Sequence, residues 1–257
     1  MMGLANRRIK IAITVLAVSA LLVGWEIYVK ISEIDALTLP APTGIAQALI
    51  HNYDSVIRAL YVTGCEVIIG ISCGIIVGML VAYLMFIMRG LTHLMHTLLV
   101  ISQTIPIIAI APLLIIWFGF GLTNKILLVA VYTFFPVAIS FLKGLGSATL
   151  DQIDVARTLG ACRWWRLIHL HTPAAAGQLF SGIKIAVTYA PATAALAEYV
   201  GARQGLGIML ISAQASFRTD LVFVVAFVLM AMSVLLYGTA TLVESVVVKS
   251  GKAESND

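Results

Sequence analysis

Charged residues are scarce in this chain of 257 residues. Asp, Glu, Lys and Arg make up 11% of it, whereas hydrophobic residues make up 61%. Soluble domains contain roughly 25% charged residues. The mean hydropathy of +1.03 points in the same direction. The composition therefore argues against an ordinary water-soluble fold and predicts an integral membrane protein.

Long basic runs and cysteines are also scarce, and this limits the possible classes of function. No run of basic residues is longer than the pair Arg7 and Arg8, so the pI near 9.0 is not interpreted as a nucleic-acid footprint. The three cysteines, Cys65, Cys73 and Cys162, provide no disulfide framework. We interpret them as small apolar packing residues.

Motifs for nucleotide binding and catalysis are missing as well. The chain has no G-x4-G-K-[ST] phosphate loop, so it is not expected to hydrolyse ATP itself. The glycine-rich "GARQGLG" follows no predicted strand, and no cofactor is expected on this chain. The histidine pairs His93/His96 and His169/His171 have no carboxylate or cysteine at ligand spacing, so no metal site is predicted. The sequence shows no arrangement of a nucleophile and a base that would indicate an enzyme.

Long apolar stretches are what the chain does contain. A membrane-spanning helix needs about 20 mostly apolar residues. Segments such as "ILLVAVYTFFPVAISFL" lack the alternation of apolar and polar residues that a barrel strand shows. Because backbone groups in lipid must be hydrogen-bonded within the segment, the sequence predicts an all-α fold. We expect six spans, at residues 9–29, 58–89, 94–117, 126–142, 174–197 and 221–243.

The distribution of Lys and Arg predicts the orientation. With six spans, both termini and the connections 89–93 and 143–173 share one side, which carries ten Lys and Arg residues. The other side carries five, Lys125 among them. The positive-inside rule therefore places both termini in the cytoplasm. The first apolar run exceeds a typical signal-peptide core and lacks a convincing cleavage site, so it is expected to remain as a span.

The expected organisation is one membrane domain with short appendages. A cytoplasmic N-terminus covers residues 1–8, the transmembrane domain covers 9–246, and a cytoplasmic tail covers 247–257. On the outer side, Thr43 is predicted to cap an amphipathic helix lying flat on the membrane. The apolar face of that helix would carry Ile45, Leu49, Ile50 and Tyr53. A second apolar piece, at 206–217, is too short to span.

A polar-rich cytoplasmic loop, at about 147–173, interrupts the apolar runs and contains "DVARTLGACRWWRLIHLHTP". Thr149 or Asp151 is expected to cap its first helix. Four apolar residues recur every three positions along one side of this helix: Leu150, Ile153, Ala156 and Leu159. Gly160 ends or kinks it, since glycine tolerates the left-handed conformation.

The second half of the loop indicates an interfacial helix containing Arg163, Trp164, Trp165 and Arg166, and Pro173 begins the next span. From the residues alone, two interpretations remain open. The loop is either an amphipathic segment on the inner leaflet or a docking platform for a cytoplasmic partner.

The same stretch resembles the EAA loop of ABC-importer inner-membrane permeases, whose pattern is E-A-A-x3-G-x9-I-x-L-P. The matching positions are Asp154, Val155, Ala156, Gly160, Leu170, Thr172 and Pro173. Asp for Glu and Val for Ala keep the chemical character of the pattern, whereas Thr172 is a mismatch. Under this resemblance, the candidate ATPase-coupling residues are Asp154, Ala156, Arg157, Gly160, Arg163 and Pro173.

The resemblance extends over roughly residues 37–245. "LPAPTG", "SQTIPIIAIAPLLIIWFGFG", "KILLVAVYTFFPVAISFLKGL" and "AEYVGARQGLG" resemble, in order, segments of the subfamily serving taurine, alkanesulfonates, nitrate and thiamine-precursor pyrimidines. It implies the type I importer permease fold in a bacterial inner membrane. It also implies three kinds of partner: a second, identical permease subunit, two cytoplasmic ATPases that hold ATP and Mg²⁺, and an extracytoplasmic binding protein.

Polar groups and prolines inside spans are candidates for the substrate path. They are Gln103, Pro106, Pro112, Tyr189, Thr193 and Glu198. The prolines are equally consistent with a hinge and with ordinary kinked packing, and Gln103 with a bond to a neighbouring helix. Glu198 lies near the outer boundary, where it could gate the path, pair with Arg203 or be solvated.

Other residues of the spans are interpreted structurally. A stripe of small residues predicts close packing of two helices; its members are Gly182, Ala186, Ala190 and Ala194. Lys184 is expected to snorkel toward the interface. Glu66 is expected to have a structural partner.

The substrate is the least constrained feature. "KIAVTYAPATAALAEYVGARQGLG" and "SFRTDLVF" look most like the hydroxymethylpyrimidine or aminopyrimidine branch, and no intramembrane Arg cluster suits a sulfonate or nitrate. Sulfonate or taurine import and nitrate or bicarbonate import remain alternatives. An ion-coupled secondary transporter using Glu66 or Glu198 is the alternative from another class.

Overall fold

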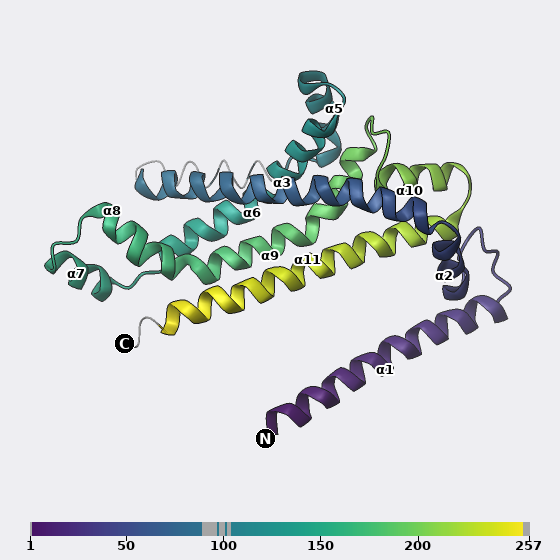
Figure 1. Ribbon diagram of the computed structural model, residues 1–257, viewed down its shortest axis with the longest axis horizontal. Helices are drawn as coiled ribbons and strands as arrows, with labels where there is room; N and C mark the ends of the chain where they lie inside the picture. The colour runs from purple at the N-terminus through teal and green to yellow at the C-terminus, as the bar shows by residue number, and fades with distance from the viewer. Residues whose placement is uncertain (1, 89–96, 98–100, 102–103, 254–257) are drawn as a thin grey trace. The chain divides into compact units, whose positions relative to one another are not determined.

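A computed structural model of the protein describes residues 2–88, 97, 101 and 104–253 (Figure 1). All regular structure in these residues is helical, which confirms the all-α prediction. The elements are α1 (Met2–Ile31), α2 (Pro42–His51), α3 (Tyr53–Ile87), α5 (Ile107–Phe118), α6 (Leu122–Leu145), α7 (Leu150–Thr158), α8 (Arg163–Arg166), a π-helical turn (Leu167–His171), α9 (Thr172–Glu198), α10 (Leu206–Ala215) and α11 (Thr219–Ala253).

Five helices in the described residues are long and apolar enough to cross a membrane: Ile13–Ile31, Tyr53–Ile87, Leu122–Leu145, Arg163–Glu198 and Thr219–Val248. They correspond to five of the six predicted spans. Most of the first half of the remaining one, 94–117, lies outside the described residues. Its second half forms α5, which is 12 residues long and contains Pro112.

The chain divides into two compact units, one made of Met1–Arg58 and Met209–Val228, the other of Ala59–Ile208 and Leu229–Asp257. In the first unit, Trp25 of α1 packs against Phe223 and Phe227 of α11. Ile45 and Ala48 of α2 are buried in the same apolar cluster. This cluster gives the first unit a core of its own.

The prediction that Thr43 caps α2 is wrong. The N-cap is Ala41, and Pro42 occupies the first turn, where its missing N–H costs nothing. Thr43 instead donates from its backbone N and its Oγ1 to the two carboxylate oxygens of Glu26, at 3.0 and 2.8 Å. The helix N-terminus thus receives a negative charge from α1. Of the predicted apolar face only Ile45 is buried; Leu49, Ile50 and Tyr53 are exposed.

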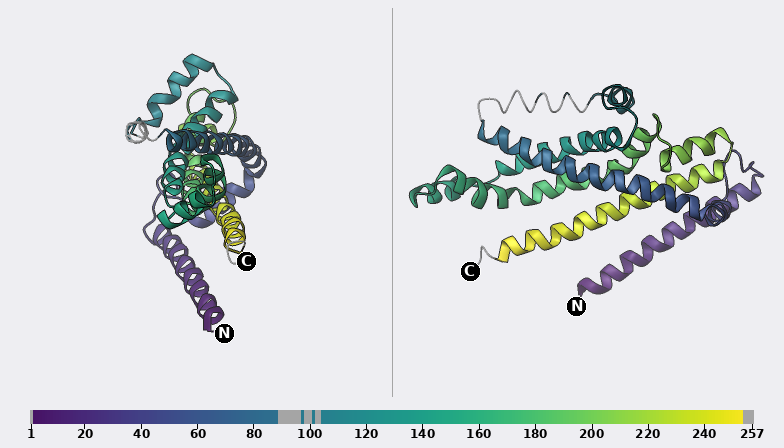
Figure 2. Two further views of the ribbon diagram at one scale, coloured as in Figure 1. Left: turned by 90° about the vertical axis from the view of Figure 1, so that its left-hand side faces the viewer. Right: turned by 45° about the horizontal axis from the view of Figure 1, so that its top comes forward.

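In the second unit, α3, α6 and α9 run side by side (Figures 1 and 2). The predicted small-residue stripe of α9 is confirmed as a packing surface, because all four of its members are buried. A Cβ on Gly182 would lie 2.6 Å from the Pro136 carbonyl oxygen of α6. Likewise, a Cβ on Gly144 of α6 would lie 2.9 Å from Ala175 of α9.

A second small-residue stripe, which the sequence analysis missed, joins α3 to α6. Gly70, Gly74 and Gly78 face α6, and a Cβ on Gly74 would come within 2.7 Å of the Ala130 carbonyl oxygen. The segment "GISCGIIVG" contains two overlapping G-x3-G motifs, a known signal for close helix packing in membranes. Residues of α11 complete this core, where Ala240 is buried with Val67 and Val187.

Candidate functional site: an exposed loop and a buried polar network

The loop between α6 and α9 begins with a fully capped helix. Thr149 Oγ1 accepts from the Gln152 backbone N at 3.4 Å, and Gln152 Oε1 accepts from the Thr149 backbone N at 3.2 Å. This reciprocal capping box satisfies two backbone donors at once. Of the two predicted caps, Thr149 is therefore confirmed. Asp151 lies in the first turn, where its charge suits the helix dipole.

The end of α7 is set by Gly160, as predicted. Gly160 has φ +77°, the left-handed region that side chains disfavour. The Ala161 N donates to the Ala156 carbonyl and the Gly160 N donates to the Arg157 carbonyl, both at 2.9 Å. These two bonds form a Schellman motif. A Cβ at Gly160 would meet nothing within 4 Å, so the backbone conformation, not packing inside the chain, requires glycine.

Several apolar side chains of α7 and the following turn are exposed. Leu150 and Leu159 are 77% and 81% exposed, and Val155 and Trp164 are also exposed. Asp154 and Arg157 form an ion pair of 3.2 Å, with both side chains more than half exposed. Such a pair adds little stability by itself. Ala156 is buried. The described structure thus places Leu150, Asp154 and Arg157 on one short helix, with Gly160 in the turn that ends it.

The predicted separate interfacial helix is wrong in one respect. Arg163–Arg166 runs through a π-helical turn directly into α9, so a continuous helix extends from Arg163 to Glu198. Pro173 lies in the first turn of α9, as predicted. Consequently, Arg163 and Trp164 belong to the same continuous helix as the membrane span, and this helix, Arg163–Glu198, is called the rod below.

The base of this rod is bonded to two other helices. Thr172 Oγ1 donates to the Leu167 carbonyl at 2.7 Å and lies 2.9 Å from the Tyr83 hydroxyl of α3. His171 Nδ1 lies 2.8 Å from the Leu145 carbonyl of α6 and its side chain is buried. Thr172, the mismatch to the loop pattern, therefore has a structural role: it satisfies a π-turn carbonyl and ties the rod to α3.

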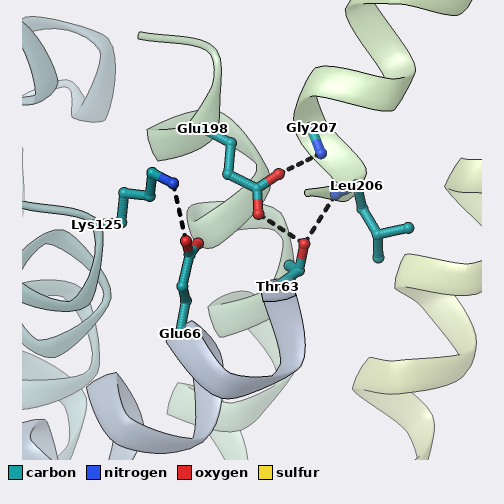
Figure 3. Close-up of polar contacts among 6 residues, drawn as sticks. All are labelled: Thr63, Glu66, Lys125, Glu198, Leu206 and Gly207. Atoms are coloured by element: carbon teal, nitrogen blue, oxygen red, sulfur yellow. Dashed lines mark hydrogen bonds and ion pairs between the residues drawn. The ribbon is translucent and has the colours of Figure 1, made fainter. Parts of the chain in front are cut away.

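A buried polar network lies at the other end of α9 (Figure 3). Glu198 is fully buried. Thr63 Oγ1 of α3 donates to Glu198 Oε1 at 2.6 Å, and the Gly207 backbone N of α10 donates to Glu198 Oε2. Thr63 Oγ1 also accepts from the Leu206 backbone N at 2.8 Å. Glu198 therefore caps the N-terminus of α10, which favours a negative charge. The alternatives of a solvated Glu198 and of a pair with Arg203 are wrong.

Two glycines make room for the Glu198 carboxylate. Gly205 has φ +129°, and a Cβ there would collide with Glu198 Oε1. A Cβ on Gly207 would collide with the Ala195 carbonyl and approach Glu198 Oε2 to 2.9 Å. The last two glycines of "GARQGLG" thus allow a carboxylate of this chain to approach the backbone. The glycine-rich segment was recognisable in the sequence, but its contact with Glu198 was not.

Glu66 has the structural partner that was expected, and the partner is Lys125. The Lys125 Nζ lies 2.9 Å from Glu66 Oε1, and both side chains are buried (Figure 3). Lys125 had been assigned to the outer loop, but α6 begins at Leu122 and takes Lys125 into the helix core. Within the described residues, Glu66 Oε2 has no hydrogen-bond partner.

The remaining path candidates are not brought together. Gln103 lies outside the described residues. Pro106 is the N-cap of α5, and the neighbouring Ile105 carbonyl accepts from the Tyr132 hydroxyl at 2.6 Å. Thr193 is buried and donates to the Tyr189 carbonyl at 3.0 Å, so it faces packed protein.

Tyr189 and Lys184 lie on the more accessible part of α9. Tyr189 is exposed. Lys184, for which no partner was predicted, has one in α11, since its Nζ lies 2.9 Å from Glu244 Oε2. A partner that is 60 positions away in the sequence leaves no local signal.

Comparison with known proteins agrees with this architecture. Residues 74–249, more than half of the chain, match the family model described as "Binding-protein-dependent transport system inner membrane component". A probable ABC transporter permease of Haemophilus influenzae is 32% identical over 230 residues, covering 90% of this chain and 94% of the relative.

Two relatives with named substrates are similar to almost the same degree. The formylaminopyrimidine transport permease of Halalkalibacterium halodurans is 31% identical over 227 residues, covering 88% of this chain and 90% of the relative. The taurine transport permease of Escherichia coli is 31% identical over 232 residues, covering 84% and 81%. The chain therefore belongs to the family of binding-protein-dependent transport system inner membrane components and is an ABC-importer permease with the all-helical type I fold.

Proposed function

We propose that residues 147–173 are the segment through which cytoplasmic ATPases drive this permease. The observation that carries the proposal is the exposure of apolar side chains at α7. Leu150 at its start and Leu159 just after its end are exposed near the Asp154–Arg157 pair. Exposed apolar patches outside lipid mark interaction surfaces. A partner that covers them would gain apolar burial and charge-assisted hydrogen bonds together.

The mechanism follows from how the loop is anchored. Gly160 leaves open space beside the end of α7, so a partner backbone could approach closely there. Force applied at Arg163 or Trp164 would pass along the continuous rod to α9, and through Thr172 and His171 to α3 and α6. Packed helices with two stable arrangements convert such a push into opening on one side of the membrane. Asp154, Ala156, Arg157, Gly160, Arg163 and Pro173 are the residues assigned to coupling.

The partners and the orientation belong to the same proposal. The permease works with a second, identical permease subunit, two ATPases that bind ATP and Mg²⁺, and an extracytoplasmic solute-binding protein. The loop and both termini lie in the cytoplasm. This chain supplies the path and no ATPase site, in agreement with the missing phosphate-loop motif.

The solute is a thiamine-precursor pyrimidine, with taurine or another sulfonate as the main alternative. The formylaminopyrimidine relative supports the first, and the equally similar taurine relative supports the second. Two lysines inside the described spans, Lys184 and Lys125, are each paired with a glutamate, so neither is free to bind a sulfonate. The pairing of these two lysines favours the uncharged pyrimidine over a sulfonate.

Uptake by the reconstituted transporter tests the proposal. The complete assembly of permease, ATPases and binding protein in proteoliposomes is expected to accumulate labelled hydroxymethylpyrimidine only when ATP reaches the ATPases. The permease alone is expected to accumulate nothing under an imposed proton gradient. Accumulation by the permease alone would instead establish an ion-coupled transporter.

A further inference from the structure

Two membrane-spanning helices in the second unit share a polar surface that neither the coupling loop nor the buried network uses. A groove of about 350 Å³ lies on this surface. It is lined from α9 by Ser181, Lys184, Ile185, Thr188 and Tyr189, and from α11 by Tyr237. The polar residues of α9 recur at the three- and four-residue spacing that places side chains on one helix face.

This groove lies at membrane depth. At 1.5 Å per residue, Lys184 is about 18 Å along α9 from Thr172 and about 21 Å from Glu198. Tyr189 and Tyr237 are 66% and 47% exposed. Polar and ionisable groups inside a bilayer face water-filled cavities or other protein, because exposure to lipid is costly. The surface therefore suits contact with an aqueous path or with other protein and not with lipid.

The hydroxyl groups of the groove are arranged for a ligand with both donors and acceptors. Ser181 Oγ donates to the Gly177 carbonyl at 3.0 Å, and Thr188 Oγ1 donates to the Lys184 carbonyl at 2.7 Å. Since each proton is used within α9, the oxygen lone pairs remain as acceptors. In the described part of the chain, neither phenol hydroxyl of Tyr189 or Tyr237 has a hydrogen-bond partner, so both are available to donate.

The charge of the groove excludes an ionic ligand. Its one charged lining residue, Lys184, is paired with Glu244 at 2.9 Å, and both side chains are about one-fifth exposed. A sulfonate or nitrate entering here would find no unpaired cation, whereas an uncharged ligand loses no ionic hydration. Two exposed aromatic side chains, Tyr189 and Tyr237, add ring faces against which a flat molecule can stack.

We propose that this groove is a solute-binding station on the permease and that its ligand is a small, uncharged, planar nitrogen heterocycle. Stacking on Tyr189 and Tyr237 would fix the orientation of the ligand ring. The hydroxyl oxygens of Ser181 and Thr188 would accept hydrogen bonds from amino or hydroxyl groups of the ligand. The inference rests on the proposed function, because the groove serves the solute that the assembled transporter delivers.

The experiment measures ATP-driven uptake of labelled hydroxymethylpyrimidine by the complete reconstituted transporter. Tyr189→Leu and Tyr237→Leu are each expected to reduce uptake at least tenfold, while ATPase activity and subunit composition stay normal. Tyr189→Phe keeps the ring and is expected to lose less than Tyr189→Leu. Tyr61→Leu, a change at another exposed tyrosine in a span, is the matched control and is expected to leave uptake unchanged.

Glu244→Gln tests the charge argument. It leaves Lys184 without its counter-ion, so taurine is expected to become a competitor of pyrimidine uptake, which it is not for the unaltered protein. A competition profile identical to that of the unaltered protein would contradict the assignment of an uncharged ligand.

Three further outcomes overturn the inference while leaving the proposed role as an ATPase-driven permease intact. The first is normal uptake by both leucine variants. The second is loss of the second permease subunit from those variants, which would make the groove a subunit interface. The third is an unaltered transporter that imports taurine and not the pyrimidine under ATP. Failure of the proposed function is different and recognisable, since the unaltered assembly then shows no ATP-driven uptake of either probe.

Discussion

Thr63 and Glu198 are 135 positions apart in the sequence, and a hydrogen bond of 2.6 Å joins Thr63 Oγ1 to Glu198 Oε1 in the core of the second unit. The same hydroxyl oxygen accepts from the Leu206 backbone N. One side chain thus connects α3 to the end of α9 and to the start of α10. The turn between α9 and α10 is fixed by this bond and by the cap on Gly207.

Replacing Thr63 with valine keeps the shape of the side chain and removes the hydroxyl. Leu206 N and Glu198 Oε1 would each lose a partner in a fully buried site, and an unsatisfied buried group costs about 1–3 kcal/mol. We expect the thermal unfolding midpoint of the purified permease in detergent to fall clearly. Thr239→Val is the control, since the Thr239 hydroxyl bonds only its own helix at an exposed position; an equal fall in both variants would refute the role of Thr63.

Lys125→Met breaks the buried ion pair on one side only. Glu66 would then be a buried charge without its cation, and breaking a buried pair in this way costs about 3–5 kcal/mol. The variant is expected to be poorly folded, as judged by monodispersity in size-exclusion chromatography. The double variant Glu66→Gln with Lys125→Met removes both charges and is expected to recover most of the loss. A double variant as unstable as the single one would show that the charge pairing is not the cause.

Gly74→Leu tests the close approach of α3 to α6. A side chain at Gly74 would meet the Ala130 carbonyl, so the two helices would have to separate. We expect a loss of several kcal/mol, of the order that overpacking and cavity formation produce in cores, measured as a lower unfolding midpoint. Gly64→Leu, in the same helix with nothing within 4 Å of its Cβ position, is expected to be tolerated.

Gly160→Asp tests the coupling loop. Its side chain would strain a left-handed residue at the end of α7 and place a charge in the space left for a partner. Insertion into the membrane is expected to be normal, whereas association with the ATPase subunits in pull-downs is expected to be lost. Gly119→Asp is the matched control, because Gly119 also has a positive φ, +76°, and nothing within 4 Å of its Cβ position. This variant is expected to keep normal association with the ATPase subunits. Normal association by the Gly160 variant would defeat the assignment.

Much of the coupling loop was predictable because its determinants are local. The Thr149 cap and the Gly160 stop, which were predicted, each depend on residues within a few positions of one another. The ion pair between Asp154 and Arg157 is equally local, although the sequence analysis did not predict it. The structural role of Thr172 was not predicted, since it depends on Tyr83, which is 89 positions away in the sequence.

The substrate-path candidates were predicted less well. Polarity inside a span marks a residue as unusual, but it does not say whether the residue faces a cavity or packed protein. Thr193 proved to be buried, with its hydroxyl bonded to the Tyr189 carbonyl of its own helix, while Tyr189 is exposed in the groove shared with Tyr237. Only the packing of α9 against its neighbours separates these two cases.

The sequence by itself determined that the chain is a bundle of membrane helices and which residues form the middle of five of them, whereas their ends differ from the predicted ones. Hydropathy, helix period and capping act through backbone geometry over a few residues, so a single chain reveals them. Only the tertiary structure decided the partners of the buried charges: Glu66 with Lys125, Lys184 with Glu244, and Glu198 with Thr63 and Gly207. These choices depend on which helix faces meet, and the small-residue stripes of α3 and α9 decide this by allowing the helices to approach closely.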